Sequence, residues 1–370
     1  MLQMNLNRAY EYFFDTLKSR INQIFPLKKC NLKKGLKRMW ITSGIKKSSK
    51  HKRDLYQKML DGLVSQEFYK KYSNILKQVV RQSKKNAEMT FIANSENKTK
   101  ATWTLINKTT KNERDKDKSL FEVFPEKSEE DLLNEMNAFF LKSAPRPDMS
   151  NKTDTETVRP LDSSIFLGPV LEEEMLGYIR LLKNKKTVGY DEIPVDLLKT
   201  CASILVKPLT HIINRILQVG EYPQALKQAL VKPIHKKGNK NIYDNYRPIS
   251  ILSNINKIFE RIIFDKVLHF FEMNNILVKQ QCGFRQGKST INAMYQALNS
   301  IIKSLNKNQV TAALCLDLTK AFDSVNHNIL LEKMEKYGIR GVALDLFRSY
   351  LTRRTQRTTE RGRNGKQGKK

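Results

Sequence analysis

The sequence predicts an α+β fold for the second half of the chain, preceded by a mainly helical and basic first part. Three observations support this prediction. Apolar residues recur at helical spacing along much of the chain, short apolar runs of strand length lie between some of these segments, and hydrophobic residues make up 40% of the composition. With 370 residues, the chain suffices for about two domains with a sizeable core.

The charge of the chain points to a polyanionic partner. The formal net charge is +30, from 67 Lys and Arg against 37 Asp and Glu. Nucleic acid is the first candidate, because phosphate contacts supply most of its non-specific affinity. A membrane surface is the second, but no run approaches the roughly 18 apolar residues that a spanning helix needs. Solubility alone would require a smaller surplus.

The cysteines do not predict a metal site. All four lie far apart and form no C-x-x-C pair, so we interpret them as reduced thiols of an intracellular protein.

The first residues do not resemble a signal peptide. Lysine runs are weak nuclear signals, so the choice between nucleus and cytoplasm stays open. No small-molecule cofactor is expected.

The first part of the chain is basic and helical in pattern. Residues 28–58 contain twelve Lys or Arg and one acid. Beyond them, apolar residues at helical spacing among lysines and arginines predict a long amphipathic helix: Phe68, Tyr72, Ile75, Leu76 and Val79. Its cationic face would either follow a nucleic acid or simply be solvated. Charged residues 108–130 are predicted to be loop-like, and residues 142–164, polar with three prolines, are predicted to be a linker.

The pattern of the second part is typical of a globular domain. Helical periodicity is found in four segments, of which the second is closed by Gly220: 172–186, 195–220, 251–275 and 327–338. Two apolar runs are predicted strands, one at 229–238 that ends in a glycine turn and one at 311–318. The last residues, 353–370, have almost no apolar side chain and are predicted to be a disordered basic tail.

One carboxylate occupies a position suited to metal binding. The run at 311–318 places Asp317 at the end of a predicted strand, before a turn. A carboxylate held there can bind Mg²⁺ against a triphosphate, and two such ions about 4 Å apart would activate a primer 3′-OH. An aspartate in this place also caps ordinary turns, so its position alone leaves both interpretations open.

Segments around Asp317 resemble, in the correct order, motifs of reverse transcriptases of the non-LTR retrotransposon class. D-L-T-K-A-F-D-S-V at 317–325 resembles the first palm motif. Four upstream segments, K-P-I-H-K-K-G, N-Y-R-P-I-S-I-L, K-I-F-E and Q-C-G-F-R-Q-G-K-S-T, resemble fingers and early palm motifs: 232–238, 245–252, 257–260 and 281–290. The segment 182–194 resembles the motif before the fingers, and 40–57 and 100–110 resemble the connector between endonuclease and polymerase.

The resemblance implies an α+β right-hand polymerase with fingers and a partial palm, preceded by a mainly helical basic region. The implied domains are a helical basic connector region at 1–141, a linker at 142–164, an N-terminal extension of the fingers at 165–214, a truncated reverse transcriptase domain at 215–352, and a basic disordered tail at 353–370.

The resemblance also implies the catalytic residues. Asp317 would be the catalytic, metal-binding aspartate, and the main-chain carbonyl of Leu318 would face the same Mg²⁺. Phe322 would lie under the incoming sugar, where a flat, rigid wall excludes a 2′-OH. Asp323 is expected to orient the turn rather than to bind metal.

Further residues are implied for the substrates. Lys236, which we favour over Lys237, and Arg247 would bind the triphosphate of a dNTP, since guanidinium suits bidentate phosphate contacts. Three residues of the segment 281–290 would lie along the RNA template or the DNA primer: Gly283, Arg285 and Lys288. A Walker A loop is not present, because the segment lacks G-x-x-x-x-G-K-[ST].

The implied function is an RNA-directed DNA polymerase that is incomplete in this sequence. The second palm motif and the [FY]-x-D-D motif do not occur, and one carboxylate cannot hold two Mg²⁺ ions. We therefore expect no polymerase activity from this chain alone, and poor solubility where apolar surface lacks its partner strands. One alternative is a non-catalytic, basic, nucleic-acid-binding remnant. A group II intron maturase is another, although Y-R-P-I-S and the connector segments favour the non-LTR class.

Overall fold

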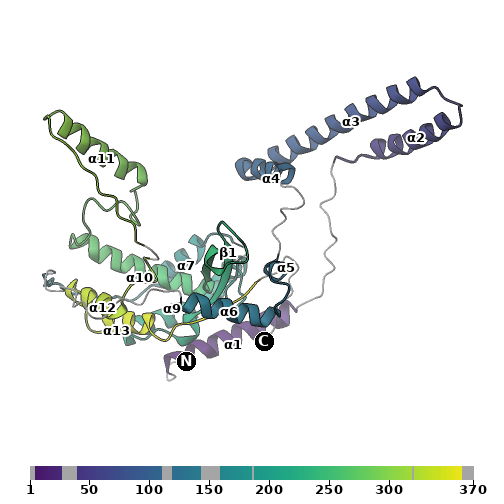
Figure 1. The fold of residues 1–370 in the computed structure, drawn as a ribbon. Helices are drawn as coiled ribbons and strands as arrows, with labels where there is room; N and C mark the ends of the chain where they lie inside the picture. Colours follow the sequence, from purple (N-terminus) through teal and green to yellow (C-terminus); the bar gives the residue numbers. More distant parts are fainter. Residues whose placement is uncertain are drawn as a thin grey trace. The chain divides into compact units, whose positions relative to one another are not determined.

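The computed structural model describes residues 5–26, 40–110, 119–142, 159–185, 187–318 and 321–360. The chain forms two compact units, one of residues Leu27–Lys118 and one of Met1–Pro26 together with Ser119–Lys370 (Figure 1). Helices and a small sheet occur together, which confirms the α+β class. Most of the predicted linker and the end of the tail lie outside the described residues. None of the described helices is both long and apolar enough to cross a membrane.

The smaller unit is built from three helices, α2 (Ser43–Leu60), α3 (Gln66–Ala93) and α4 (Lys98–Thr110). Helices α2 and α3 form a hairpin, and side-chain oxygens of Thr42 and Ser65 cap their first turns. The predicted long helix is therefore confirmed. Its apolar stripe is not uniformly buried, however, because Phe68, Ile75 and Val79 are 54, 53 and 49% exposed.

A helical core organises the larger unit. Helix α9 (Ala202–Val219) lies at its centre and buries nine residues. Around it are α1 (Leu6–Ile24), α7 (Glu172–Leu181), α8 (Val195–Thr200), α10 (Asn254–Met273) and α13 (Val342–Leu351), and α12 (His327–Lys336) packs on α13. The four predicted helical segments are confirmed, and Gly220 ends α9 in the left-handed conformation, with φ 71°. Helix α1, which the sequence assigns to the connector region, buries Tyr10 and Phe13 in this core.

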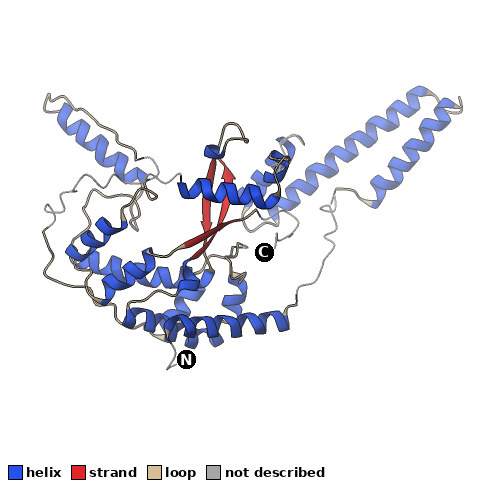
Figure 2. Cartoon of the chain, turned by 60° about the horizontal axis from the view of Figure 1, so that its bottom comes forward, coloured by secondary structure: helices blue, strands red, loops and turns tan. Residues whose placement is uncertain are grey.

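The sheet has three strands in the order β2-β1-β3. Strand β1 (Gln228–His235) pairs antiparallel with β2 (Tyr246–Ile251) and parallel with β3 (Thr355–Thr358). Short 3₁₀ turns precede β1 and β2, at Gln224–Lys227 and Tyr243–Asn245. Helix α6 (Glu129–Lys142) and the short α5 (Leu120–Val123) pack against one face of this sheet (Figure 2).

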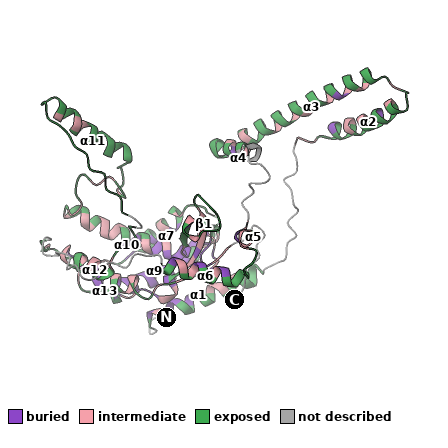
Figure 3. Cartoon of the chain, viewed as in Figure 1, coloured by how far each residue is buried: buried purple, intermediate pink, exposed green. Residues whose placement is uncertain are grey.

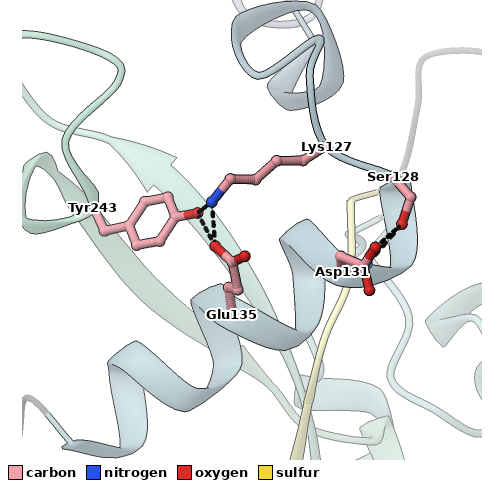
Figure 4. Close-up of polar contacts among 5 residues, drawn as sticks. All are labelled: Lys127, Ser128, Asp131, Glu135 and Tyr243. Atoms are coloured by element: carbon pink, nitrogen blue, oxygen red, sulfur yellow. Dashed lines mark hydrogen bonds and ion pairs between the residues drawn. The ribbon is translucent and has the colours of Figure 1, made fainter.

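Polar contacts fasten α6 beside the sheet (Figure 4). The Tyr243 hydroxyl donates to Glu135 Oε2 at 2.8 Å, and Lys127 Nζ donates to both groups. These bonds lower the pKa of Glu135. At the start of α6, the Ser128 hydroxyl accepts from the Asp131 backbone N–H at 3.1 Å, which caps the helix.

Three sequence predictions need correction. The predicted strand 311–318 is an irregular, exposed segment, because no described strand lies beside it and a strand requires a hydrogen-bonded partner. The predicted disordered tail contains β3, since backbone pairing with β1 does not need apolar side chains. The predicted loop 108–130 contains α5 and the start of α6.

Apolar surface is left uncovered near the first of these segments. Helix α11 (Thr290–Leu305) buries no residue and exposes a stripe at helical spacing (Figure 3): Ile291, Met294, Tyr295, Leu298, Ile302 and Leu305. Leu314 and Leu316 are 85 and 84% exposed. The apolar surface that was expected to lack a cover is therefore present, while the expected poor solubility stays a prediction.

Candidate functional site

Two predicted triphosphate-binding residues lie on the same face of the β1–β2 hairpin. Arg247 of β2 pairs with Ile234 of β1, and the Lys236 N–H donates to the Asn245 carbonyl at 2.8 Å. Because side chains alternate along strands, Lys236 and Arg247 are diagonal neighbours on one face, about 7–8 Å apart. Both side chains are exposed.

The turn between the two strands is held by local bonds. Gly238 has φ +83°, and a Cβ there would lie 2.9 Å from Asn245 Nδ2. The Asn245 side chain donates to the Asn239 carbonyl at 2.8 Å, and the Tyr246 hydroxyl donates to the Lys240 carbonyl at 2.8 Å. The predicted glycine turn is confirmed, and these bonds position Lys236 relative to the strands.

The two faces of the hairpin differ in their surroundings. On one face, Val231 and Tyr246 are buried against α6. On the face that carries Lys236 and Arg247, Ile234 and Ile249 are 47 and 44% exposed. The sequence interpretation missed these two isoleucines as site residues. The period-two alternation along both strands was the signal that would have placed them beside the cations.

The predicted template segment follows α10 as an irregular loop. Arg285 is held there, because its guanidinium donates to the Val278 carbonyl at 3.4 Å and lies 3.8 Å from Glu272 Oε1. A Cβ added to Gly283 would meet nothing within 4 Å, so the backbone is open to approach there. Lys288 is exposed, and its side chain has no recorded partner in the described part of the chain.

An aromatic contact joins the template segment to the first palm motif. Phe284, with φ 59°, and Phe322 place their rings edge to face, with centroids 5.9 Å apart. They are 86 and 80% exposed. The structure therefore brings the segments 281–290 and 317–325 together, although 26 residues lie between them. It records no contact that joins either segment to Lys236 or Arg247 among the described residues.

Asp317 and Leu318 are exposed at the end of the irregular segment that precedes Phe322. Within the described ranges, no group of three or more His, Cys, Asp or Glu side chains is placed to hold a metal ion. Asp317 is therefore a single carboxylate that is free to serve as one ligand, and the described residues do not complete a metal site around it.

The motif 182–194 fastens its glycine turn to the start of α10. Gly189 lies against the backbone of Ser253, where an added Cβ would be 2.6 Å from the nitrogen. The Asn254 side chain donates to the Ile193 carbonyl at 2.8 Å. Between these contacts, Asp191 is 1% exposed, and its Oδ1 accepts only a long bond of 3.4 Å from the Ile193 N–H.

Burial raises the pKa of Asp191 to about 6, although the Ile193 N–H and the Lys18 ammonium oppose the shift. The folded chain therefore binds this proton more tightly than the unfolded chain. The stability that this proton contributes is complete below about pH 4 and is lost as the pH rises through about 6.

We expect the Asp191→Asn variant to be more stable than the parent chain at neutral pH, by about 2 kcal/mol. The pKa shift of Asp191 alone corresponds to roughly 3 kcal/mol of stability at neutral pH. The amide N–H of the introduced asparagine would lack a partner, which partly offsets this gain. Urea unfolding at pH 4, 5, 6 and 7.5 measures the difference, which should be smallest at pH 4 and grow up to about pH 6. A difference in the free energy of unfolding that does not change with pH would contradict the raised pKa of Asp191 in the folded chain.

Comparison with known proteins finds similarity in the second half of the chain. Residues 234–369 match the family described as "Reverse transcriptase (RNA-dependent DNA polymerase)". The chain is 33% identical over 178 residues to a probable RNA-directed DNA polymerase from transposon BS of Drosophila melanogaster. The matched region is 48% of this chain and 20% of that protein.

Two further relatives come from the same organism. The RNA-directed DNA polymerase from mobile element jockey is 31% identical over 178 residues, which is 48% of this chain and 19% of the relative. The probable RNA-directed DNA polymerase from transposon X-element is 31% identical over 201 residues, which is 54% of this chain and 22% of the relative. The chain thus spans about a fifth of the length of these relatives. Together, the matches show that the second half of the chain is similar to reverse transcriptases, among them RNA-directed DNA polymerases of transposons and mobile elements.

Proposed function

We propose that this chain contributes the fingers and the first part of the palm of an RNA-directed DNA polymerase. The substrates would be dNTPs, an RNA template and a DNA primer, as the names of the relatives suggest. The observation that carries the proposal is the placement of Lys236 and Arg247 as neighbours on the uncovered face of the β1–β2 hairpin.

That face suits a nucleoside triphosphate. Arg247 can contact phosphate oxygens in a bidentate manner, and Lys236 adds a compact positive charge about 7–8 Å away. The exposed side chains of Ile234 and Ile249 lie beside the two cations. Apolar neighbours exclude water once a ligand is bound, which strengthens the attraction between the cations and phosphate.

Phe322 and the template segment support the remaining roles. The exposed Phe322 ring is braced edge-on by Phe284, so it can present a rigid wall to the sugar of an incoming nucleotide. Gly283 and Lys288 flank this pair on the same loop, open to a nucleic-acid backbone. Arg285 would contribute through its charge, although Glu272 partly neutralises it.

Mg²⁺ is the metal that this chemistry uses, and when bound it neutralises charge on the triphosphate. The Asp317 carboxylate and the main-chain carbonyl of Leu318 would supply two of its oxygen ligands. Both residues are exposed, and the donor types fit a hard cation. Further carboxylates would have to come from outside the described residues, because these offer no cluster of three ligands.

Primer extension by a chimera tests the proposal. Residues 1–352 would be joined to the polymerase segment that follows the corresponding region of the transposon BS relative. We expect extension of a DNA primer on an RNA template with Mg²⁺ and dNTPs. If a folded chimera neither extends the primer nor binds the template–primer in preference to single-stranded RNA, the proposed function is wrong.

In this chimera, the Lys236→Gln and Arg247→Gln variants should each raise the KM for dNTP by about tenfold. One charge-assisted hydrogen bond to phosphate contributes roughly 1.5 kcal/mol or more. The matched control is Lys237→Gln, which removes the same charge from the neighbouring residue, also exposed, in the turn that follows β1. An equal effect from Lys237→Gln would contradict the assignment of Lys236.

A second candidate is a non-catalytic protein that binds nucleic acid through charge alone. The observation that favours it is the absence, within the described residues, of partner carboxylates for Asp317. The two candidates differ in their preference among ligands. Binding by charge alone follows salt concentration without distinguishing a template–primer from other nucleic acids of equal length.

A further inference from the structure

The hairpin of α2 and α3 in the smaller unit contains a basic groove. It encloses about 760 Å³ and is lined by nine residues of the two helices. Five of them are cations, Lys52, Arg53, Lys77, Arg81 and Lys84, and none is an acid. This composition is unusual for a contact between helices, where apolar side chains normally face each other.

The lining of the groove that is not charged consists of two serines and two aliphatic side chains. Ser49 of α2 and Ser73 of α3 contribute hydroxyl groups, and Leu76 and Val80 complete the lining. Ser73 is 8% exposed, and its small volume lets the helices approach closely. The groove therefore offers hydroxyl and aliphatic surface beside its cations.

The cations of α3 follow one line along the helix. Lys77, Arg81 and Lys84 are spaced by four and three residues, so they share a face at intervals of about 6 and 4.5 Å. From Glu67 to Glu88, α3 contains no other acid to neutralise them. A row of like charges at this spacing repels itself, and a polyanion with regularly spaced phosphates would relieve that repulsion.

Aromatic rings mark both ends of the groove. The Lys84 ammonium lies 4.8 Å from the Trp40 ring centroid, and the Lys52 ammonium lies 5.9 Å from that of Tyr69. Tyr56, which is 47% exposed, extends the second end through a ring contact with Tyr69. Basic grooves flanked by aromatic rings are typical of sites for single-stranded nucleic acid, because the rings stack on bases of any sequence.

We propose that the α2–α3 groove binds the phosphate backbone of a single nucleic-acid strand, at a site separate from the proposed nucleotide site. Packed helices have axes about 8–10 Å apart, so the trough between them is narrower than a double helix. The distance along α3 from Tyr69 to Lys84 is about 22 Å, which accommodates a short run of nucleotides. The site belongs to a different compact unit from Lys236 and Arg247.

The two tryptophans of the chain allow a direct test. Trp40 and Trp103 both belong to the smaller unit, and Trp40 lies beside the groove. In full-length protein with Trp103→Phe, Trp40 is the only tryptophan. Titration with an oligouridine of roughly 20 nucleotides should change Trp40 emission, because a strand that engages Lys84 alters the charge next to the indole ring. Oligothymidine of equal length distinguishes RNA from DNA as the source of the phosphates.

Charge removal then locates the site. We expect Lys77→Gln with Arg81→Gln to weaken oligouridine binding by about tenfold near 0.1 M salt. The slope of log K against log salt should fall by about 1.4, at about 0.7 for each phosphate contact on a single strand. The matched control is Lys71→Gln with Lys85→Gln, which removes two exposed charges from α3 outside the groove and should leave the slope nearly unchanged.

Several outcomes would overturn the proposal. Equal losses in the groove and control variants would mean that net charge alone drives binding. Unchanged Trp40 emission at saturating oligouridine would place the strand elsewhere. Displacement by polyglutamate of matched charge, as effective as oligouridine, would indicate an acidic protein partner instead. Circular dichroism of each variant checks that the helices are intact. Since the emission reports only on the smaller unit, a negative result leaves the chimera experiment unaffected.

Discussion

Loss of the Asp317 carboxylate should abolish nearly all polymerase activity. In the chimera with the transposon BS segment, we expect Asp317→Ala to lower the rate of primer extension by about a thousandfold. A metal ligand at the reacting phosphate contributes several kcal/mol to the transition state, and each 1.4 kcal/mol corresponds to a factor of ten. Single-turnover extension with a radiolabelled primer measures the chemical step directly.

The control for this variant lies six residues further along the same motif. Asp323 is also exposed, in the turn where the Ser324 hydroxyl donates to the Ala321 carbonyl. We expect Asp323→Ala to lower the rate by about tenfold or less, because this acid would orient the turn rather than hold the metal. If Asp323→Ala were the more damaging variant, the roles of the two aspartates would have to be exchanged. Template–primer affinity should be unchanged in both variants.

Substitution of Gly189 should cause a large loss of stability. We expect Gly189→Ala to lower the free energy of unfolding by about 3 kcal/mol. The added Cβ would lie 2.6 and 2.7 Å from Ser253 N and Cα, and 2.8 Å from Leu252 C. These are backbone atoms at the start of α10, so the collision cannot be relieved by a side-chain rotation. Urea unfolding followed by circular dichroism at 222 nm measures the change.

Gly177 provides the matched control. It lies inside α7, where a Cβ would meet nothing within 4 Å. Alanine favours a helix interior over glycine by roughly 0.5–1 kcal/mol, so Gly177→Ala should stabilise the chain by about that amount. Opposite signs for the two substitutions would separate a steric collision from a general response to alanine. A stable Gly189→Ala variant would mean that the 182–194 turn does not press on α10.

Much of the helical structure was predictable, because its signals are local. Helix α9 shows its apolar period within its own 18 residues, and Gly220 marks its end. Helix α1 carried a similar signal, since Leu6, Tyr10 and Phe13 are spaced for one face. Its partner, however, lies far along the chain, so local reasoning assigned α1 to the basic region instead of to the core.

The strands were less predictable, because a strand exists only with its neighbour. Residues 311–318 have the apolar composition of a strand but no described partner, and they are irregular. Thr355–Thr358 have little apolar character, yet they form β3 because β1 offers an unpaired edge. In both cases, the tertiary environment overrides the propensity of the segment.

The candidate site shows the same division. Once the register between β1 and β2 is known, the alternation of side chains along the strands places Lys236 and Arg247 on one face. The contact between Phe284 and Phe322 does not follow, because it depends on the path of the chain between two loops. The basic groove was indicated only as a cationic helix. Its shape required the packing of α2 on α3.

The place of α1 in the core has a consequence for synthesis on the ribosome. About 180 residues separate the end of α1 from the start of α9, and the smaller unit is made in between. At a translation rate of about 5–20 residues per second, the apolar face of α1 emerges roughly 9 to 36 s before its partner. Throughout that interval the nascent chain carries an amphipathic helix whose apolar face lacks its core partner. The core around α1 can therefore assemble only after α9 has been translated, while the α2–α3 hairpin can fold during that interval.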